Sequence, residues 1–213
     1  FFFCMTSAIL LKHYNFLTQN ILFPITMAKD TVDYILERRS VRNLSGEPVK
    51  EEDIQKILSV ACSAPTGRNL QKLRYYYTSN PSIIKECGLD IFKAISPMMP
   101  HLEKRREALG ITEPIFYDGS FVIVIASLPA EEEGFEKIDT GIAAGMIMTA
   151  AQSLGYRTVP LGIICYADEK IHEHFKIPAD MKIQLGVTIG TGAMEDPAKP
   201  TSLPMDELCT LVE

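Results

Sequence analysis

The run Phe-Val-Ile-Val-Ile-Ala at residues 121–126 decides the fold, because it is continuously apolar and rich in β-branched residues. Asp118 and Gly119, which favour a turn, stand just before it. A short apolar run that follows turn residues predicts a strand buried on both of its faces. We therefore expect this strand inside a central sheet.

Helical and strand patterns alternate around this strand. The most apolar helical pattern, residues 139–154, predicts a long buried helix capped by Asp139 or Thr140. Other helices are predicted to end near Arg38 and to cover residues 50–63, a segment from 80 onward, 101–109 and 168–175. Further strands are predicted over residues 73–78, 158–165 and 183–189. The order of these elements indicates an α+β fold with one central sheet.

The composition is that of an ordinary globular protein. Of the 213 residues 46% are hydrophobic and 23% charged, which predicts one domain that needs no metal or disulfide to fold. The formal net charge of -6 argues against nucleic acid as the main partner, because phosphate backbones require a broad basic surface. The five cysteines are odd in number and contain no Cys-x-x-Cys pair, so we expect a reducing, cytoplasmic location and no cysteine zinc site.

The first 26 residues differ from the rest of the chain. They are mostly apolar, with Lys12 as their only Lys, Arg, Asp or Glu, but no stretch reaches the length of about 18 apolar residues that spans a membrane. They also lack the basic start and cleavage site of a signal peptide. We expect residues 1–26 to be a non-native or poorly ordered extension and residues 27–213 to form the domain. A helix packed on the domain is the alternative.

Three cations, Arg38, Arg39 and Arg42, lie within five residues where the first predicted helix ends, with Ser40 among them. Basic residues at a helix C-terminus complement the helix dipole, so the group has a purely structural interpretation. The functional interpretation is a phosphate clamp, because guanidinium groups bind phosphate oxygens in pairs and a serine hydroxyl adds a hydrogen bond. The two interpretations are about equally good for this segment alone.

A polar loop after Pro65 presents two amides, Asn69 and Gln71. Amides in loops usually face solvent, but an amide offers both a donor and an acceptor, which the pyrimidine edge of a flavin requires. Gly190-Thr191-Gly192 imitates a dinucleotide-binding loop, but no amphipathic helix follows it, so a Rossmann fold is excluded.

Four motifs in this order resemble the nitroreductase family of FMN-dependent NAD(P)H oxidoreductases. They are Arg-Arg-Ser-Val-Arg at 38–42, Ala-Pro-Thr-Gly-Arg-Asn-Leu-Gln at 64–71, the helix 139–154 that ends in Gly155, and Val-Pro-Leu-Gly at 159–162. The resemblance runs from about Lys29 to the C-terminus. It implies an α/β sandwich with a central, mostly antiparallel sheet flanked by helices, and a homodimer with FMN at the subunit interface.

The resemblance also implies the cofactor-binding residues. Arg38, Arg39 and Ser40 match positions around the FMN phosphate and ribityl chain, and Arg42 matches one beside the ribityl chain or the N1/O2 edge. The other implied contacts are Asn69 and Gln71 at the ring, Pro160, Leu161 and Gly162 along the isoalloxazine with a backbone N–H of Leu161 or Gly162 near N5, and Lys199 at the phosphate. The chain departs from the family at Lys72-Leu73, where Pro-Trp is common, and at Thr201, where a second basic residue is usual.

The implied activity is reduction of a nitroaromatic, quinone or similar acceptor by NADH or NADPH, in a ping-pong mechanism without a catalytic side-chain triad. Residues 96–117 contain an irregular connector of a kind that often forms a lid, with Phe116 and Tyr117 as candidate pocket walls. Two alternatives stay open: a specialised enzyme of the same fold, such as a dehalogenase or a flavin-fragmenting enzyme, and a flavin-binding module without turnover.

Overall fold

The computed structural model describes residues 31–129, 134–192 and 201–212. Contacts divide the chain into a short unit, Phe1–Asp33, and a main unit, Tyr34–Glu213, and the description below concerns the main unit. The extension expected at residues 1–26 lies outside the described residues, so it stays a prediction.

Helices and strands make up most of the described chain. The α-helices are α2 (Thr31–Glu37), α3 (Glu51–Cys62), α4 (Pro81–Ile95), α5 (His101–Leu109), α6 (Glu136–Ser153), α7 (Asp168–Phe175) and α8 (Met205–Leu208). The strands are β1 (Leu73–Thr78), β2 (Phe121–Ser127), β3 (Arg157–Leu161) and β4 (Lys182–Gly190). Two short 3₁₀ helices are η1 (Gly67–Asn69) and η2 (Gly162–Ala167).

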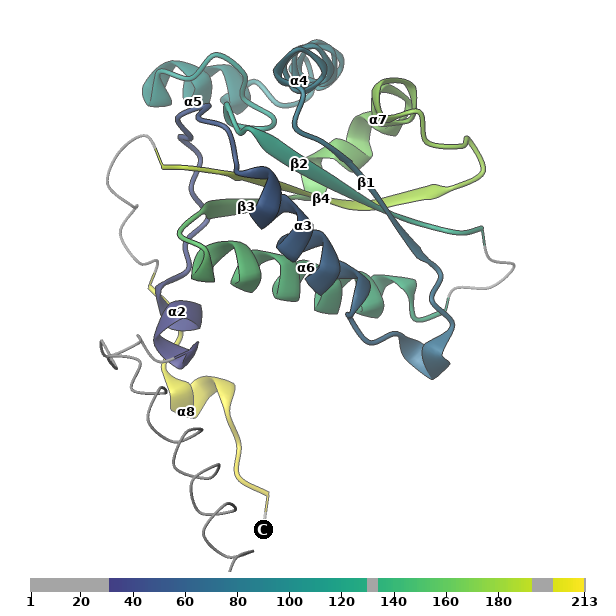
Figure 1. Ribbon diagram of the computed structural model, residues 1–213. Helices are drawn as coiled ribbons and strands as arrows, with labels where there is room; N and C mark the ends of the chain where they lie inside the picture. The colour runs from purple at the N-terminus through teal and green to yellow at the C-terminus, as the bar shows by residue number, and fades with distance from the viewer. Residues whose placement is uncertain (1–30, 130–133, 193–200, 213) are drawn as a thin grey trace, which may run out of the picture. The chain divides into compact units, whose positions relative to one another are not determined.

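The four strands form one sheet in the order β1-β2-β4-β3, and every neighbouring pair is antiparallel. All residues of β2 are buried, which confirms the strand predicted from its continuous apolar run. The α+β prediction with a central antiparallel sheet is therefore confirmed (Figure 1).

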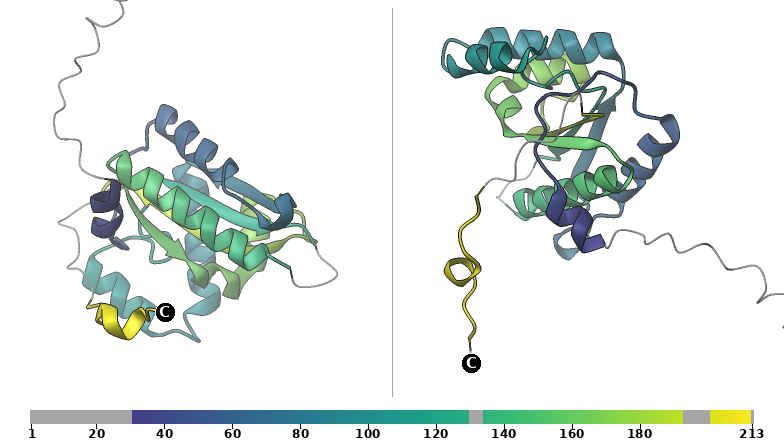
Figure 2. Two further views of the ribbon diagram at one scale, coloured as in Figure 1. Left: turned by 90° about the horizontal axis from the view of Figure 1, so that it is seen from below. Right: turned by 90° about the vertical axis from the view of Figure 1, so that its left-hand side faces the viewer.

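Helices cover both faces of the sheet. On one face α3 and α6 lie side by side and pack on Ile123, Ile125 and their neighbours (Figure 2). On the other face α4, α5 and α7 pack on Val122, Val124 and their neighbours. Successive side chains of a strand point to opposite faces, so β2 contributes to both cores.

Most predicted boundaries agree with the structure, and two differ. Helix α6 begins at Glu136 rather than Asp139, because Asp139 lies in the first turn and accepts a hydrogen bond from another segment instead of capping its own helix. Strand β3 ends at Leu161 rather than Cys165, because a 3₁₀ helix starts at Gly162.

Helix α6 is apolar on nearly every side, yet only one of its faces is buried. Ala143, Ala144 and Ile147 pack against the sheet, whereas Ile138 is 61% exposed and Ile142 is 39% exposed. The expectation of a fully buried helix is wrong for the isolated chain. The exposed apolar face is therefore available for an intermolecular contact.

The connector after α5 packs into the core instead of forming a separate lid. Ile115 and Phe116 are fully buried and Tyr117 is 3% exposed, all in the core beneath α4 and α5. The assignment of Phe116 and Tyr117 as pocket walls is therefore wrong, because their side chains fill the interior.

Candidate functional site

The segment of residues 38–42, called the arginine segment below, follows α2 and runs beside β3. The Val41 N–H donates to the Thr158 carbonyl at 3.1 Å, and Ser40 forms a parallel bridge with Thr158. Val41 is 3% exposed, so its side chain anchors the segment in the core. The structure thus brings the segment that contains Arg38, Ser40 and Arg42 next to the strand that leads to Pro160.

Arg38 carries an unsatisfied donor. Its Nη1 is buried and has no hydrogen-bond partner among the residues that the structure describes. Burial lowers the pKa of Arg38, and the neighbouring charge of Arg39 lowers it further. A buried guanidinium N–H without an acceptor is unfavourable, so an anion at this position would remove the cost. The residues present therefore fit a phosphate group.

The other two arginines contact the local backbone. Nη1 of Arg39 donates to the carbonyls of Leu36 and Arg38, each at 2.9 Å. Nη1 of Arg42 donates to the Ser40 carbonyl at 3.3 Å, and Arg42 is exposed. Each guanidinium has further N–H groups, so these contacts hold the side chains without using all their donors.

Thr158 adds a hydroxyl that sequence reasoning missed. It is 1% exposed, and its Oγ1 is buried without a hydrogen-bond partner within the described part of the chain. Its bridge to Ser40 places it beside the arginine segment. The sequence gives no sign of this, because a threonine in a strand usually serves only to pack.

The loop with the two predicted amides has a strained backbone. Arg68, Asn69 and Gln71 have φ angles of 53°, 55° and 49°, in the left-handed region that residues with a side chain rarely adopt. The Gln71 side chain donates from Nε2 to Oδ1 of Asn69 at 2.9 Å, so the two amides form a pair. Such strain persists only where surrounding contacts fix it, and it is concentrated at functional sites.

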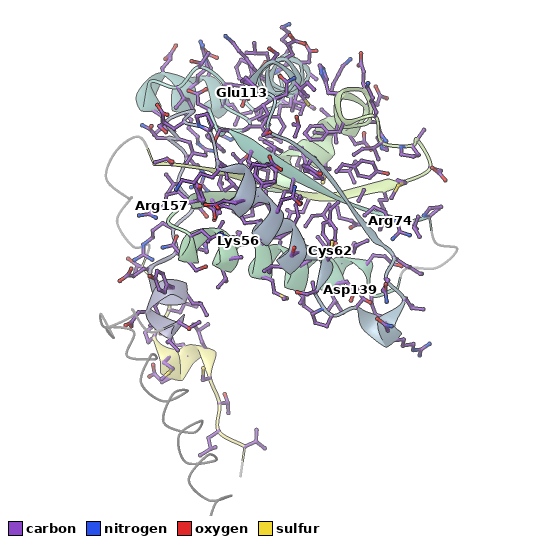
Figure 3. The ribbon with its side chains drawn as sticks, in the orientation of Figure 1. Lys56, Cys62, Arg74, Glu113, Asp139 and Arg157 are labelled. Carbon is purple, nitrogen blue, oxygen red and sulfur yellow. The ribbon has the colours of Figure 1, made fainter. Side chains whose placement is uncertain are left out.

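Two carboxylates at the start of α6 hold this loop. The Gly67 N–H donates to Oδ1 of Asp139 at 2.9 Å, and Nζ of Lys72 lies 2.9 Å from Oε1 of Glu136. Asp139 is 4% exposed and Glu136 is 7% exposed. Figure 3 shows Asp139 beside the η1 turn. The sequence interpretation missed these anchors, although acids in the first turn of an apolar helix were a visible signal.

The remaining predicted residues lie at the end of β3 or outside the described chain. Leu161 is 2% exposed and pairs with Gly186 of β4. Gly162 is exposed, and no described atom lies within 4 Å of the position that a Cβ would take there. A backbone with open space beside it can be approached closely by a planar ligand. Lys199 lies outside the described residues.

The arginine segment and the loop with Asn69 and Gln71 lie at opposite ends of α6, and Pro160 and Leu161 lie farther along β3, where Leu161 pairs with Gly186 in the middle of β4. Near the start of α6, Asp139 holds the loop of residues 66–72, called the amide loop below. The other end of α6 leads into β3, and there the Tyr156 N–H donates to the Ala151 carbonyl at 2.9 Å. At about 1.5 Å per residue, Asp139 and Ser153 lie about 21 Å apart along the axis. In Figure 3 Asp139 and Arg157 lie at opposite ends of the helix.

The described residues contain no group of three or more His, Cys, Asp or Glu side chains arranged for a metal ion. None of the described helices is both long and apolar enough to cross a membrane. Arginines beside the edge strand β3, with a loop of amides at the other end of α6, suit a protein that binds a phosphate-bearing cofactor.

Comparison with known proteins identifies the family. The sequence model of the Nitroreductase family matches residues 35–191, so the chain belongs to this family. It is 24% identical over 205 residues to Protein DrgA of Synechocystis sp., covering 86% of this chain and 97% of that one. It is also 24% identical over 188 residues to the FMN reductase [NAD(P)H] of Bacillus subtilis, covering 80% and 69% of the two chains.

The fold is similar to solved nitroreductases. A nitroreductase with bound FMN from Desulfitobacterium hafniense superposes with a TM-score of 0.74 at 25% identity, covering 87% of this chain and 99% of that one. The sandwich inferred from the resemblance is therefore confirmed.

Proposed function

We propose that this member of the Nitroreductase family is an FMN-dependent oxidoreductase that takes reducing equivalents from NADH or NADPH. Its acceptors are nitroaromatics, quinones or similar small molecules, which react after the nicotinamide has left, in a ping-pong mechanism. The buried, unpartnered Nη1 of Arg38 carries this proposal, because it is a donor that lacks an anionic acceptor. FMN, when bound, supplies the hydride chemistry.

The arginine segment binds the phosphate end of the cofactor. Arg38 donates its buried Nη1 N–H groups to phosphate oxygens, and the Ser40 and Thr158 hydroxyls add hydrogen bonds in this proposal. Arg39 and Lys199 contribute further positive charge at the phosphate. Arg42, at the exposed end of the segment, holds positive charge beside the ribityl chain or the N1/O2 edge.

The end of β3 lies along the ring of the cofactor. Pro160 and Leu161 hold this backbone in the sheet, and the open space at Gly162 admits the ring. The N–H of Leu161 or Gly162 then donates toward N5. Asn69 and Gln71 donate to and accept from the polar edge of the ring. No catalytic acid or base side chain is required.

A homodimer completes the site, because in one chain the amide loop and the arginine segment lie at opposite ends of α6, which spans about 21 Å from Asp139 to Ser153. Helix α6 presents Ile138 and Ile142 to solvent, and a Cβ at Gly141 or Gly145 would meet no described atom within 4 Å. Two copies of this face packed antiparallel about a twofold axis place the start of one α6 beside the end of the other. The amide loop of one subunit then approaches the arginine segment of its partner.

The enzyme acts in the cytoplasm on small molecules, and residues 27–213 are its FMN-binding domain. Residues 1–26 lie outside that domain.

The test is a spectral cycle on the purified protein. The preparation is expected to be yellow, to bleach with NADH or NADPH without oxygen, and to regain its colour when a nitroaromatic or quinone is added. A yellow protein that neither nicotinamide bleaches would instead be a flavin-binding module without turnover. A colourless protein that takes up no added FMN would contradict the proposal.

A further inference from the structure

Contacts within the loop of residues 66–72, and contacts from both of its ends, hold this loop in place. Within it, the Gln71 N–H donates to Oγ1 of Thr66 at 3.1 Å, and the Gln71 amide donates to Asn69. At its start, Gly67 donates to Asp139, and at its end Lys72 pairs with Glu136. Both ends are therefore tied to the first turn of α6.

These ties offset an unfavourable backbone. Each non-glycine residue in the left-handed region costs about 1 kcal/mol, and the loop contains three of them, Arg68, Asn69 and Gln71. Without external contacts the loop would relax, and the amides of Asn69 and Gln71 would lose their common orientation.

The Lys72–Glu136 ion pair is more than a surface contact. The Glu136 side chain is 9% exposed and that of Lys72 is 30% exposed, so the pair is partly shielded from solvent. The hydrogen bond from Lys72 is the largest cause that lowers the pKa of Glu136. Glu136 also accepts from the Gly134 N–H at 2.9 Å, which fixes the carboxylate at the helix start.

Lys72 stands where the resemblance predicts proline. A proline would stiffen the loop by fixing its own φ and by restricting Gln71, the residue before it. Here an ion pair to α6 stands at this position instead. The same helix presents the exposed apolar face with Ile138 and Ile142, so the loop is tied to the element that the proposed dimer buries.

We propose that the Lys72–Glu136 ion pair is a positioning contact, which fixes the Asn69 and Gln71 amides for the flavin ring in place of a stiff proline. The inference rests on the proposed function. Lys72 itself touches no cofactor in this proposal and acts through the loop that it holds.

The test compares Lys72→Met with a matched control, Lys56→Met, using full-length protein freed of flavin and titrated with FMN. Lys56 pairs with Asp53 at 2.8 Å, and the Asp53 side chain is 9% exposed like that of Glu136, but the pair lies on α3 away from the loop. Quenching of FMN fluorescence gives the Kd, and equilibration with redox dyes gives the reduction potential of the bound flavin.

Lys72→Met is expected to raise the Kd for FMN about tenfold, a factor equivalent to about 1.4 kcal/mol, and to shift the potential of the bound flavin. Lys56→Met should match the wild type in both, and Lys72→Arg, which keeps the ion pair, should restore both. If the reduction potential of the flavin bound to Lys72→Met equals that in the wild type, the inference is refuted whether or not the Kd changes. An amide that is positioned at the flavin ring must alter the potential of the ring when it moves. Wild-type protein that binds no FMN refutes the proposed function instead.

Discussion

Replacing Glu113 by glutamine should change how the stability of this protein depends on pH. Glu113 is 2% exposed, and its carboxylate accepts backbone N–H groups from Ile115 and Phe116. Burial raises the pKa of Glu113 to about 8, the nearby Asp118 adds to the rise, and the backbone hydrogen bonds oppose it. The folded protein therefore holds this proton over a pH range in which the unfolded chain has lost it.

Proton linkage gives the sign and the size of this change in the free energy of unfolding with pH. The ordinary pKa of a glutamate is 4.5, so between pH 4.5 and about 8 the folded state binds more protons than the unfolded state. The free energy of unfolding then falls as the pH rises, by up to about 1.4 kcal/mol per pH unit. From about pH 5.5 to pH 7.5 the loss is about 2 to 3 kcal/mol, and it becomes constant above about pH 8.

Glutamine does not titrate, so Glu113→Gln removes this slope, although it also gives up one of the two backbone hydrogen-bond acceptors. Urea unfolding followed by far-UV circular dichroism, at one protein concentration and one flavin content, measures both proteins across the range. The free-energy difference between them should move by about 2 to 3 kcal/mol in favour of the variant from about pH 5.5 to pH 7.5. A difference that stays constant with pH would refute the reasoning.

Three further substitutions test separate parts of the structure. A Cβ at Gly67 would lie 2.3 Å from Cγ of Phe135, so Gly67→Ala should push the amide loop off α6 at a cost of about 1 to 3 kcal/mol, and FMN titration and thermal unfolding measure both effects. Tyr156→Phe leaves the Lys50 N–H without its acceptor, so urea unfolding should show a loss of about 1 kcal/mol. Ile142→Glu puts a charge on the exposed face of α6 and should make the protein monomeric in analytical ultracentrifugation; an unchanged dimer would place the interface elsewhere.

Much of the fold could be predicted because local signals agree with the tertiary structure. The run at 121–126 is buried on both faces, as its continuous apolar pattern indicates. Asn80 followed by Pro81 starts α4 where a helix from residue 80 onward is predicted, and Oδ1 of Asn80 accepts from the backbone N–H groups of Ser82 and Ile83. These features depend only on neighbouring residues, which a sequence displays directly.

The features that escaped prediction depend on partners far along the chain. Asp139 has the sequence context of a helix cap, but its carboxylate accepts from Gly67, 72 residues away. Phe116 and Tyr117 follow an irregular connector, and only the packed structure shows that they fill the core. The arginine segment was predicted, but only the coordinates distinguish Arg38, whose Nη1 is buried without a partner in the described chain, from Arg39 and Arg42, which contact the local backbone.

The most direct test of the cofactor site compares FMN with riboflavin, which lacks the phosphate, in wild-type protein and in Arg38→Met. If Arg38 binds the phosphate, the wild type prefers FMN strongly. The variant should then lose about tenfold to a hundredfold in FMN affinity, as expected for about 1.5 to 3 kcal/mol from a charged hydrogen-bond donor, while its affinity for riboflavin stays the same. A preference for FMN that survives in Arg38→Met would show that the phosphate binds elsewhere.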